Sequence, residues 1–385
     1  MIEKKKAPKL RFPGFTNDWE QRKLGEVTEI SKGVQRGKQE ISEIQTSENP
    51  YPVYNGGQDV SGFTDEYNRE NKVMVSEGGA SAGYVNYFSD RYWSGGHNFT
   101  IDNLDNDLYF IKSILDANQQ KLYGLKVGSG LPNIQLGAIK NFDIYIPSID
   151  EQIKIGSFFA TIDSLITLHQ RKLKHTKDLK KSMLQKMFPK KGEKNPEIRF
   201  PGFTDDWEQR KFGDVGSVAM CKRIFKEQTS DEGDVPFYKI GTFGGTPDAY
   251  ISRELFDEYK KTYQYPRKGD ILISASGSIG RTVEYTGEDE YFQDSNIVWL
   301  KHGSDIDNAF LKVLYSVVKW SCEGSTIKRL YNDNFLKTEF MLPDIEEQIK
   351  IGEYFNQLDH LITLHQRELE HLKLLKKGLL QQMFI

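Results

Sequence analysis

Two long segments of the chain, residues 146–188 and 342–384, carry apolar residues at the alternating spacing of three and four that is typical of coiled-coil helices. Each segment opens with a proline followed by an acidic pair, Asp150-Glu151 or Glu346-Glu347, which suits a helix N-terminus. The pattern predicts two helices of about 36 residues, each about 54 Å long. One apolar stripe cannot remain exposed, so we expect the two helices to pair with each other in antiparallel orientation. The expected seam consists of Ile162, Ile166, His169, Leu173, Met183, Leu358, Ile362, His365, Leu369, Leu372 and Leu379.

The remaining segments show a different pattern. Short β-branched and aromatic runs such as YPVYNGG and DILISASGS are separated by Gly, Asn, Asp and Ser, which predicts short strands joined by turns. Short helices are expected near residues 107–123 and 305–322. The predicted fold class is therefore α+β, with two mixed α/β globular domains separated by two long helices in an antiparallel coiled coil. The expected boundaries are 1–148 and 191–343 for the globular domains, and 149–190 and 344–385 for the helices.

An internal repeat underlies this organisation. Residues 11–27 (RFPGFTNDWEQRKLGEV) return as residues 199–215 (RFPGFTDDWEQRKFGDV), and the two helical segments match at 27 of 43 positions. The segments between these copies, residues 28–145 and 216–341, differ in length and mostly in sequence. One unit of about 190 residues is therefore present twice, which predicts pseudo-twofold symmetry within the chain.

Composition excludes several classes of protein. The formal net charge is −3, from 52 basic and 55 acidic residues, so the chain is not a polycation. It has two cysteines, too few for a disulfide framework or a four-cysteine zinc site. An 18-residue apolar run is missing, and the basic N-terminus lacks the apolar stretch of a signal peptide. We expect a cytoplasmic protein.

The sequence contains little that indicates catalysis. It lacks a phosphate-binding GxxxxGK[ST] motif, and Asn49-Pro50-Tyr51-Pro52 has the wrong order for an amino-methyltransferase loop. A nuclease-like pattern joins Pro247-Asp248 to Glu258 and Lys260, but chance produces such matches in a chain with 28% charged residues. Two of the histidines fall at seam positions, where they are better explained as polar register residues than as metal ligands. We therefore expect neither catalytic residues nor a metal site.

Several local clusters favour DNA binding. Arginine and lysine can bind guanine edges, and asparagine and glutamine can bind adenine edges. Glycine-rich loops after two apolar strands suit contacts with phosphate, and residues 149–191 hold ten basic against four acidic side chains. A merely solvated helix face is the alternative interpretation of this basic run. The candidate DNA-binding residues are Lys32, Gln35, Arg36, Lys38, Ser76, Ser81, Tyr84 and Asn98 in the first domain, Lys222, Arg223, Lys226, Lys239, Ser276, Ser278, Arg281 and Asn296 in the second, and Lys180 and Lys181 on the first helix.

The repeated entry segment, with its PGFT and WEQRK motifs, and the repeated EQIKIG…LITLHQR helix closely resemble the specificity subunit of type I restriction–modification systems. The resemblance covers the whole chain. It implies a non-catalytic subunit whose two target-recognition domains each read one half of a bipartite, asymmetric site in double-stranded DNA, with the coiled coil setting the spacing. The implied partners are two modification subunits, which methylate adenine with S-adenosylmethionine, and two restriction subunits, which use ATP and Mg²⁺. This chain is expected to bind no cofactor itself.

Two other functions remain open at this point. One is a coiled-coil scaffold that does not bind DNA, which predicts no salt-dependent affinity for DNA. The other is a metal-dependent nuclease built on the Glu258–Lys260 pattern, which predicts cleavage by this chain alone.

Overall fold

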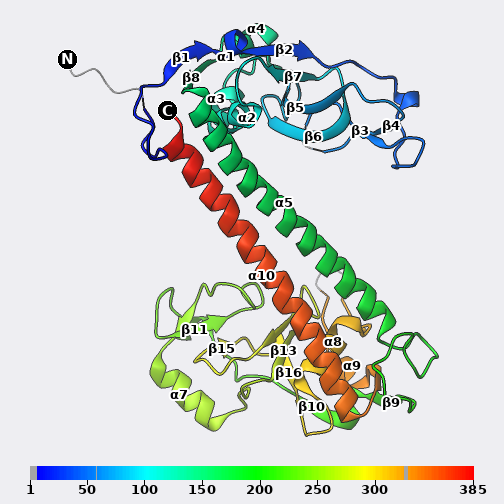
Figure 1. The fold of residues 1–385 in the computed structure, drawn as a ribbon. Helices are drawn as coiled ribbons and strands as arrows, with labels where there is room; N and C mark the ends of the chain where they lie inside the picture. The colour runs from blue at the N-terminus through cyan, green and yellow to red at the C-terminus, as the bar shows by residue number, and fades with distance from the viewer. Residues whose placement is uncertain (1–6, 58, 325–327) are drawn as a thin grey trace. The chain divides into compact units, whose positions relative to one another are not determined.

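The structure is a computed structural model that describes residues 7–57, 59–324 and 328–385. The chain divides into two compact units (Figure 1). Unit 1 combines the chain up to Arg171 with residues 366–385, and unit 2 is Lys172–His365. The two long helices, α5 (Ile149–Lys186) and α10 (Ile345–Met383), each contribute one part to unit 1 and the other part to unit 2.

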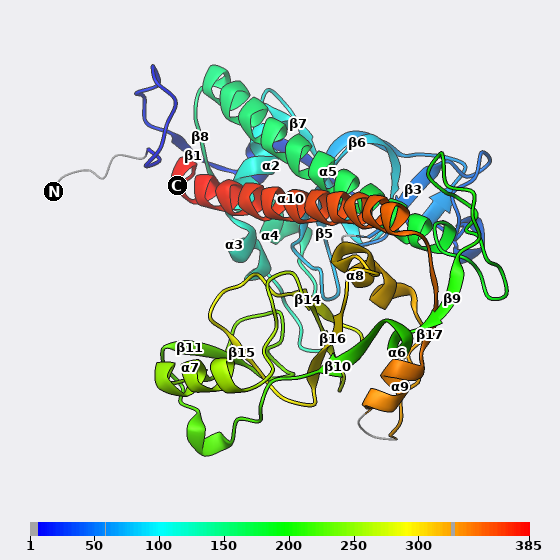
Figure 2. The ribbon, with the colours of Figure 1, turned by 90° about the horizontal axis from the view of Figure 1, so that it is seen from below.

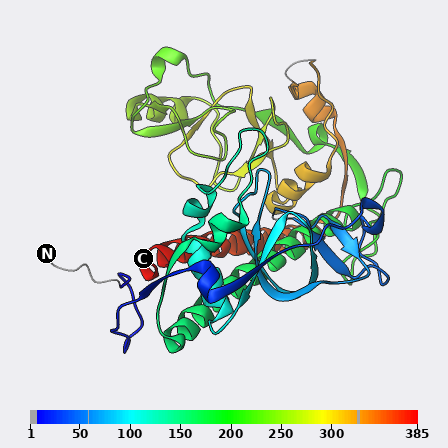
Figure 3. The same cartoon turned by 90° about the horizontal axis from the view of Figure 1, so that it is seen from above.

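Unit 1 contains a six-stranded sheet in the order β2-β7-β5-β6-β3-β4. All neighbours are antiparallel except β3 and β6, which run parallel. The strands of this sheet, drawn in blue and cyan in Figure 3, are β2 (Thr28–Lys32), β3 (Tyr51–Tyr54), β4 (Gly62–Thr64), β5 (Arg69–Ser76), β6 (Val85–Ser94) and β7 (Asn98–Asn103). A separate pair joins β1 (Glu20–Lys23) to β8 (Asp143–Ile146). The short helices of the unit are α1 (Leu24–Val27), η1 (Lys38–Glu40), α2 (Leu108–Ala117), α3 (Gln119–Tyr123) and α4 (Leu136–Lys140).

Unit 2 repeats this plan with two smaller sheets, in the orders β10-β16-β13-β14 and β12-β11-β15, and a pair formed by β9 and β17. The strands are β9 (Glu208–Lys211), β10 (Gly216–Ala219), β11 (Val235–Tyr238), β12 (Tyr250–Ile251), β13 (Ile271–Ser274), β14 (Thr282–Glu284), β15 (Tyr291–Phe292), β16 (Ile297–His302) and β17 (Glu339–Leu342). The short helices are α6 (Phe212–Val215), η2 (Lys226–Gln228), α7 (Arg253–Thr262), α8 (Asn308–Val317) and α9 (Asn332–Lys337). Helix α7 lies beside β11 and β15 (Figure 2) and packs on them through Phe256.

The long helices pair in antiparallel orientation within each unit. In unit 1, Phe159 and Ile162 from the first half of α5 share one core with Leu380 and Met383 from the end of α10. Unit 2 shows the reverse combination, with Met183 and Met187 near the end of α5 packed beside Phe355 of α10. The predicted α+β fold, with its internal repeat and its antiparallel long helices, is confirmed.

All eleven residues expected at the helix seam are buried or half-buried. Ile162 and Leu358, which are equivalent in the repeat, are each 5% exposed. The other nine, including His169 and His365, are half-buried. A charged side chain at these positions would therefore lose solvation, which is costly without a partner.

The repeated EQIKIG motif holds each long helix against its unit. The side chains of Glu151 and Glu347 are buried, and each receives two hydrogen bonds from one arginine of the repeated RFPGF segment. Arg11 donates to Glu151 at 2.6 and 2.7 Å, and Arg199 donates to Glu347 at 2.7 and 2.8 Å. The hydrogen bonds to these glutamates raise the pKa of both guanidinium groups.

The glutamine and glycine of the same motif bring α2 and α8 close to the long helices. Gln152 accepts a hydrogen bond from the backbone N–H of Asp107, and Gln348 accepts one from Asp307. Both aspartates are N-caps, of α2 and α8. The glycines of the motif have no room for a side chain, because a Cβ on either would collide with the first turn of the short helix. The motif therefore specifies how each long helix packs against the start of the short helix. We call this contact the helix junction.

In each unit, a backbone hydrogen bond also joins another segment of the chain to the end of a long helix. In unit 1 the backbone N–H of Leu10 donates to the carbonyl of Gln382, and in unit 2 that of Ile198 donates to the carbonyl of Lys186, both at 2.9 Å.

Within the described residues, we find no helix long and apolar enough to cross a membrane.

Candidate nucleic-acid interface

The strongest candidate surface lies where β5 of unit 1 ends. The loop after this strand, Glu77–Ala80, is joined by backbone hydrogen bonds to a second loop that contains Pro132 and Asn133. The N–H of Gly79 donates to Pro132 at 2.9 Å, and the N–H of Ile134 donates to Glu77 at 2.8 Å. Together with Lys32 and His97 these loops line a hollow of about 660 Å³.

The same construction occurs in unit 2 at the end of β13. The N–H of Gly277 donates to Lys328 at 3.2 Å, and that of Leu330 donates to Ala275 at 2.8 Å. The hollow beside it has a volume of about 710 Å³ and is lined by Arg329, Tyr331, Asn332 and other residues. We call these two surfaces, one in each unit, the strand-end platforms. They share a backbone arrangement, but the side chains they present differ.

Several of the candidate DNA-binding residues are accessible. Lys38, Lys222, Lys226, Ser278 and Lys181 are exposed. Lys32 is 54% exposed at its side chain and forms an ion pair with Glu77 at 2.8 Å, and Ser81 lines the same hollow. Gln35 is exposed too, with its amide donating to the carbonyl of Arg36. Such exposed polar and basic groups suit contacts with bases or phosphates.

The three candidate arginines already have partners. Arg36 binds Asp65 at 2.6 Å and lies over the ring of Trp93, so its side chain is only 12% exposed. Arg223 pairs with Asp294 at 2.9 Å but keeps 58% exposure, and Arg281 donates to the carbonyl of Ile240 at 2.7 Å. An exposed ion pair contributes little to stability, so Arg223 can exchange its carboxylate for another partner.

Three other candidates are buried. Ser76 accepts a hydrogen bond from the N–H of Gly57, and Asn98 donates to the carbonyl of Tyr54 at 2.7 Å. Ser276 is 6% exposed, beside the bridge to Arg329. The side chains of Ser76 and Asn98 therefore hold the strand ends in place, and none of the three side chains is exposed at the surface.

The remaining candidates are Tyr84, Lys239, Asn296 and Lys180. Tyr84 is half-buried and its pKa is raised by burial, while Lys239 pairs with Asp248 at 2.9 Å. The carbonyl of Asn296 accepts from the N–H of Ala275, which ties it to the loop after β13. On the long helix, Lys180 forms an ion pair with Asp359 at 2.5 Å, whereas its neighbour Lys181 is exposed.

A charge cluster that the sequence did not suggest lies between α2 and the long helices in unit 1. Lys112 and Lys376 both contact Asp116 and Asp163, and all four side chains are at most 19% exposed. Burial alone would raise the pKa of Asp163, but the two lysines outweigh it and hold that pKa below its ordinary value. Burial would also lower the pKa of Lys112, and the two aspartates reverse that effect. The only sequence signal was the i,i+4 spacing of Lys112 and Asp116.

Two of the three charged residues of the nuclease-like pattern form ion pairs with residues outside it. Asp248 pairs with Lys239, and Lys260 pairs with Asp289 at 3.1 Å. Glu258 is an exposed residue of α7. Among the described residues, we find no group of three or more His, Cys, Asp or Glu side chains arranged to hold a metal ion.

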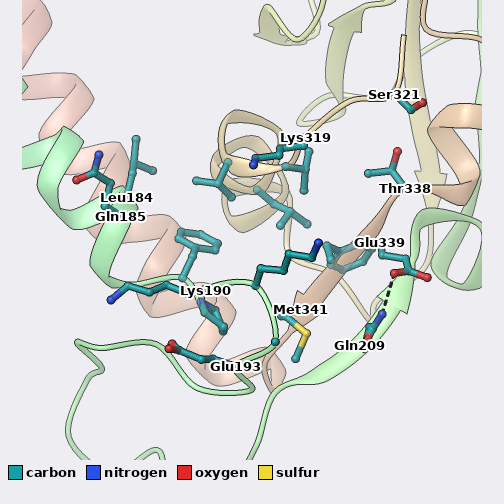
Figure 4. Close-up of a pocket in the computed structure, with 18 of the residues that line it drawn as sticks. Leu184, Gln185, Lys190, Glu193, Gln209, Lys319, Ser321, Thr338, Glu339 and Met341 are labelled. Atoms are coloured by element: carbon teal, nitrogen blue, oxygen red, sulfur yellow. Dashed lines mark hydrogen bonds between the residues drawn. The ribbon is translucent and has the colours of Figure 1, made fainter.

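Unit 2 has a further hollow of about 710 Å³ at the end of α5 (Figure 4). Leu184 and Met341 contribute apolar surface, while Lys190 and Lys319 contribute positive charge. Gln209 donates to Glu339 at 2.8 Å on one side. The equivalent hollow of unit 1, of about 340 Å³, is lined by Gln21, Tyr145 and Ile385 among others.

The long helices also carry exposed leucines that repeat. Leu165 and Leu168 in unit 1 are 40% and 44% exposed, and their equivalents Leu361 and Leu364 in unit 2 are 41% and 42% exposed. Residues three apart share a helix face, so each pair forms a small apolar surface.

The geometry defines a class of protein: a duplicated α/β unit on two long antiparallel helices, with one strand-end platform in each copy. Comparison with known proteins agrees. The family model for the type I restriction modification DNA specificity domain matches the chain twice, over residues 16–177 and 204–374. This chain belongs to that family of type I specificity subunits.

Individual relatives support the assignment. A putative type I restriction enzyme specificity subunit of Haemophilus influenzae is 35% identical over 351 residues, covering 88% of each chain. A type I restriction enzyme specificity subunit of Methanocaldococcus jannaschii is 23% identical over 408 residues, covering 96% of this chain and 92% of the relative. The crystal structure of a type I S subunit from M. genitalium has a TM-score of 0.73 at 20% identity, over 98% of this chain and 99% of that one, which shows the same fold. Specificity subunits are in general not catalytic.

Proposed function

We propose that this chain is the sequence-specific DNA-binding subunit of a type I restriction–modification complex, acting in the cytoplasm. Each strand-end platform, with the insert around it, reads one half of a bipartite, asymmetric site in double-stranded DNA. The paired long helices set the spacing between the two halves. The observation that carries the proposal is that both platforms have the same backbone hydrogen bonds but expose different side chains, such as Lys32 and His97 against Arg329 and Asn332.

This arrangement explains how a single frame serves different targets. The contacts of the EQIKIG motif repeat in both units, so each unit is held on its long helix in the same way. Recognition of bases depends on which donors and acceptors face the groove, and these side chains change without changing the frame. The accessible residues Lys32, Gln35, Lys38, Lys222, Arg223 and Lys226 are the candidates for such contacts.

The test is methylome sequencing of the host before and after deletion of this chain. Deletion should abolish methylation at one bipartite sequence. Replacing residues 216–341 with the insert of another family member should change one half of that sequence, and replacing 28–145 should change the other. A scaffold that does not bind DNA would leave the modified sequence unaltered in both replacements, and that result would reject the proposal.

We further propose that the exposed leucine pairs dock the modification subunits, one at Leu165 and Leu168 and one at Leu361 and Leu364. The partner in each case is an apolar helix face of a modification subunit, which uses S-adenosylmethionine to methylate adenine. Restriction subunits that use ATP and Mg²⁺ complete the assembly, and this chain binds none of these cofactors itself.

The docking proposal predicts a change in stoichiometry. Leu165→Glu with Leu168→Glu should reduce the number of bound modification subunits from two to one, as measured by native mass spectrometry. The equivalent changes at Leu361 and Leu364 should have the same effect, and all four together should abolish binding. Leu104→Glu is the matched control, because Leu104 is 56% exposed and lies in the loop after β7. Two bound subunits in every variant would contradict the proposal.

A further inference from the structure

Leu131 is the most exposed large hydrophobic residue in the described part of the chain, at 86% exposure. It lies in the loop that joins Val127 to Asn133, with the sequence VGSGLPN. An exposed leucine costs free energy in water, and isolated ones are common on surfaces. Leu131 differs from an isolated surface leucine because it lies at the edge of the strand-end platform.

The loop presents Leu131 on a well-anchored base. Val127 and Asn133 exchange two backbone hydrogen bonds, at 2.8 and 3.0 Å. Pro132, directly after Leu131, accepts a hydrogen bond from Gly79, which ties the loop to the end of β5. Gly128 has φ of +93°, a conformation that favours glycine and lets the loop turn back tightly. Leu131 therefore lies on a short loop whose two ends are hydrogen-bonded to each other and which is also hydrogen-bonded to the end of β5.

The surroundings of Leu131 are polar and charged, and they include the ion pair of Lys32 with Glu77. The hollow it borders is also lined by Lys32, Asn55, His97 and Asn133. A protein partner would be expected to cover a larger apolar surface, with charged residues depleted at its centre. A single apolar side chain next to hydrogen-bonding and cationic groups matches a DNA surface, where phosphates and base edges surround a stack of apolar base faces.

We propose that Leu131 is an apolar wedge that inserts between two neighbouring base pairs of the half-site read by unit 1. This rests on the proposed function of the platform as a DNA reader. Insertion partly unstacks one base step and bends the duplex, and flexible pyrimidine–purine steps accept this distortion most easily. Leu131 thereby adds specificity for a step that forms no hydrogen bond with the protein.

Unit 2 has the same anchoring for the corresponding loop. Glu323 and Arg329 exchange two backbone hydrogen bonds, at 3.0 and 2.8 Å, and the loop is tied to Gly277 through Lys328. In the sequence repeat Ile327 occupies the position that matches Leu131, and it lies outside the described residues. An apolar residue therefore recurs at this position in the sequence although most of the two inserts differs.

The experiment uses the assembled complex with its modification subunits and duplexes that carry the sequence found by methylome sequencing. 2-Aminopurine, whose fluorescence rises on unstacking, is placed in turn at each position of the unit 1 half-site. The wild-type complex should raise the fluorescence on both sides of one base step. Leu131→Ala should abolish that rise and weaken binding about tenfold, whereas Leu131→Met should retain both. Leu104→Ala, at the opposite end of the same strands, should match the wild type.

A second set of duplexes separates a wedge from a merely structural residue. An abasic site at the affected step removes the stacking that the wedge must disrupt, so Leu131→Ala should then bind within about twofold of the wild type. Equal fluorescence profiles for wild type and Leu131→Ala, or a binding defect that the abasic site does not rescue, would overturn the wedge. Loss of modification subunits from Leu131→Ala would overturn it as well, in favour of protein docking. If the wild-type complex does not bind the duplex at all, the proposed function of the chain fails instead.

Discussion

In unit 1, β6 runs unbroken from Val85 to Ser94, whereas in unit 2 the equivalent stretch is divided into β14 and β15. One sheet of six strands in unit 1 therefore becomes two sheets of four and three strands in unit 2. Unit 2 also inserts α7 between β12 and β13, where unit 1 has only a short turn between β4 and β5. The three-stranded sheet of unit 2, β12-β11-β15, packs on a separate core that includes Phe237, Phe256 and Tyr291. We call this sheet the outer sheet.

The parts near the long helices do not differ in this way. The arginine–glutamate pair, the glutamine that contacts the start of the short helix and the close-approach glycine recur in both units. The inner part of each unit, next to the long helices, is therefore under different physical constraints from the outer part, which differs between the units. The inner part must fit one helix junction, while the outer part needs only a closed core and a platform, which many sequences can supply.

The two units also differ in how charges support the helix junction. Unit 1 holds Lys112, Asp116, Asp163 and Lys376 in one buried network. In unit 2 Ser316 replaces Asp116, and the equivalent of Lys112, Lys312, pairs with Glu284 instead. Among the described residues of unit 2, the pair Lys180–Asp359 is what remains of this network, and it is more exposed. Four predictions use these differences.

The largest effect is expected at the buried glutamates. Arg11→Ala leaves Glu151 buried without its two donors, and such an uncompensated charge costs about 3–5 kcal/mol. Arg199→Ala should cost less, because Trp207 still donates to Glu347 at 3.0 Å. The equivalent Trp19 nitrogen has no hydrogen-bond partner among the described residues. The measurement is urea unfolding monitored by hydrogen exchange in each unit, and a larger loss for Arg199→Ala than for Arg11→Ala would contradict the comparison.

A smaller effect is expected for the lysines at the helix junction. Lys376→Met removes a partner from both Asp116 and Asp163, and we expect a loss of about 2–3 kcal/mol in the stability of unit 1 because Lys112 still compensates part of the charge. Lys180→Met removes one partly exposed ion pair, for which about 0–1 kcal/mol is expected. The same exchange measurement compares the two variants. Equal losses would show that the network adds nothing beyond a single pair.

The long helices and the internal repeat could be predicted from the sequence, because a seam spacing over ten turns and two near-identical segments are strong signals. The EQIKIG junction could not, although identical Arg, Glu, Gln and Gly residues in both copies marked it. Its partners lie 140 and 148 residues apart for the two arginine–glutamate pairs, and periodicity says nothing about such distances. The burial of Ser76 and Asn98 was missed for a related reason: a polar residue at a strand end looks the same whether it faces solvent or a carbonyl group.

The stability of unit 1 should depend on pH through Asp163. The pKa of Asp163 is below its ordinary value, so its charge stabilises unit 1 fully above the unfolded pKa of about 4 and less as the pH falls through the folded pKa. Asp163→Asn should therefore destabilise unit 1 at pH 7, with a difference from wild type that shrinks below about pH 4. Asp359→Asn, which removes the equivalent carboxylate of unit 2, is the matched control at pH 7. Thermal melts of wild type and Asp163→Asn from pH 3 to 7 test this, and a difference that stays constant down to pH 3 would refute the assignment.

The smallest effect concerns two adjacent lysines of α5 and their contact with DNA. Lys181 is exposed and able to approach a phosphate, whereas Lys180 is already neutralised by Asp359 at 2.5 Å. Each phosphate contact contributes about 0.9 to the slope of log K against log salt. In the assembled methyltransferase, Lys181→Ala should reduce that slope by about 1 for cognate and scrambled duplexes alike, while Lys180→Ala should leave it unchanged. Titrations across a salt series measure both slopes. An unchanged slope for Lys181→Ala would mean that the basic face of α5 is only solvated, and a reduced slope for Lys180→Ala would mean that Lys180 exchanges Asp359 for DNA.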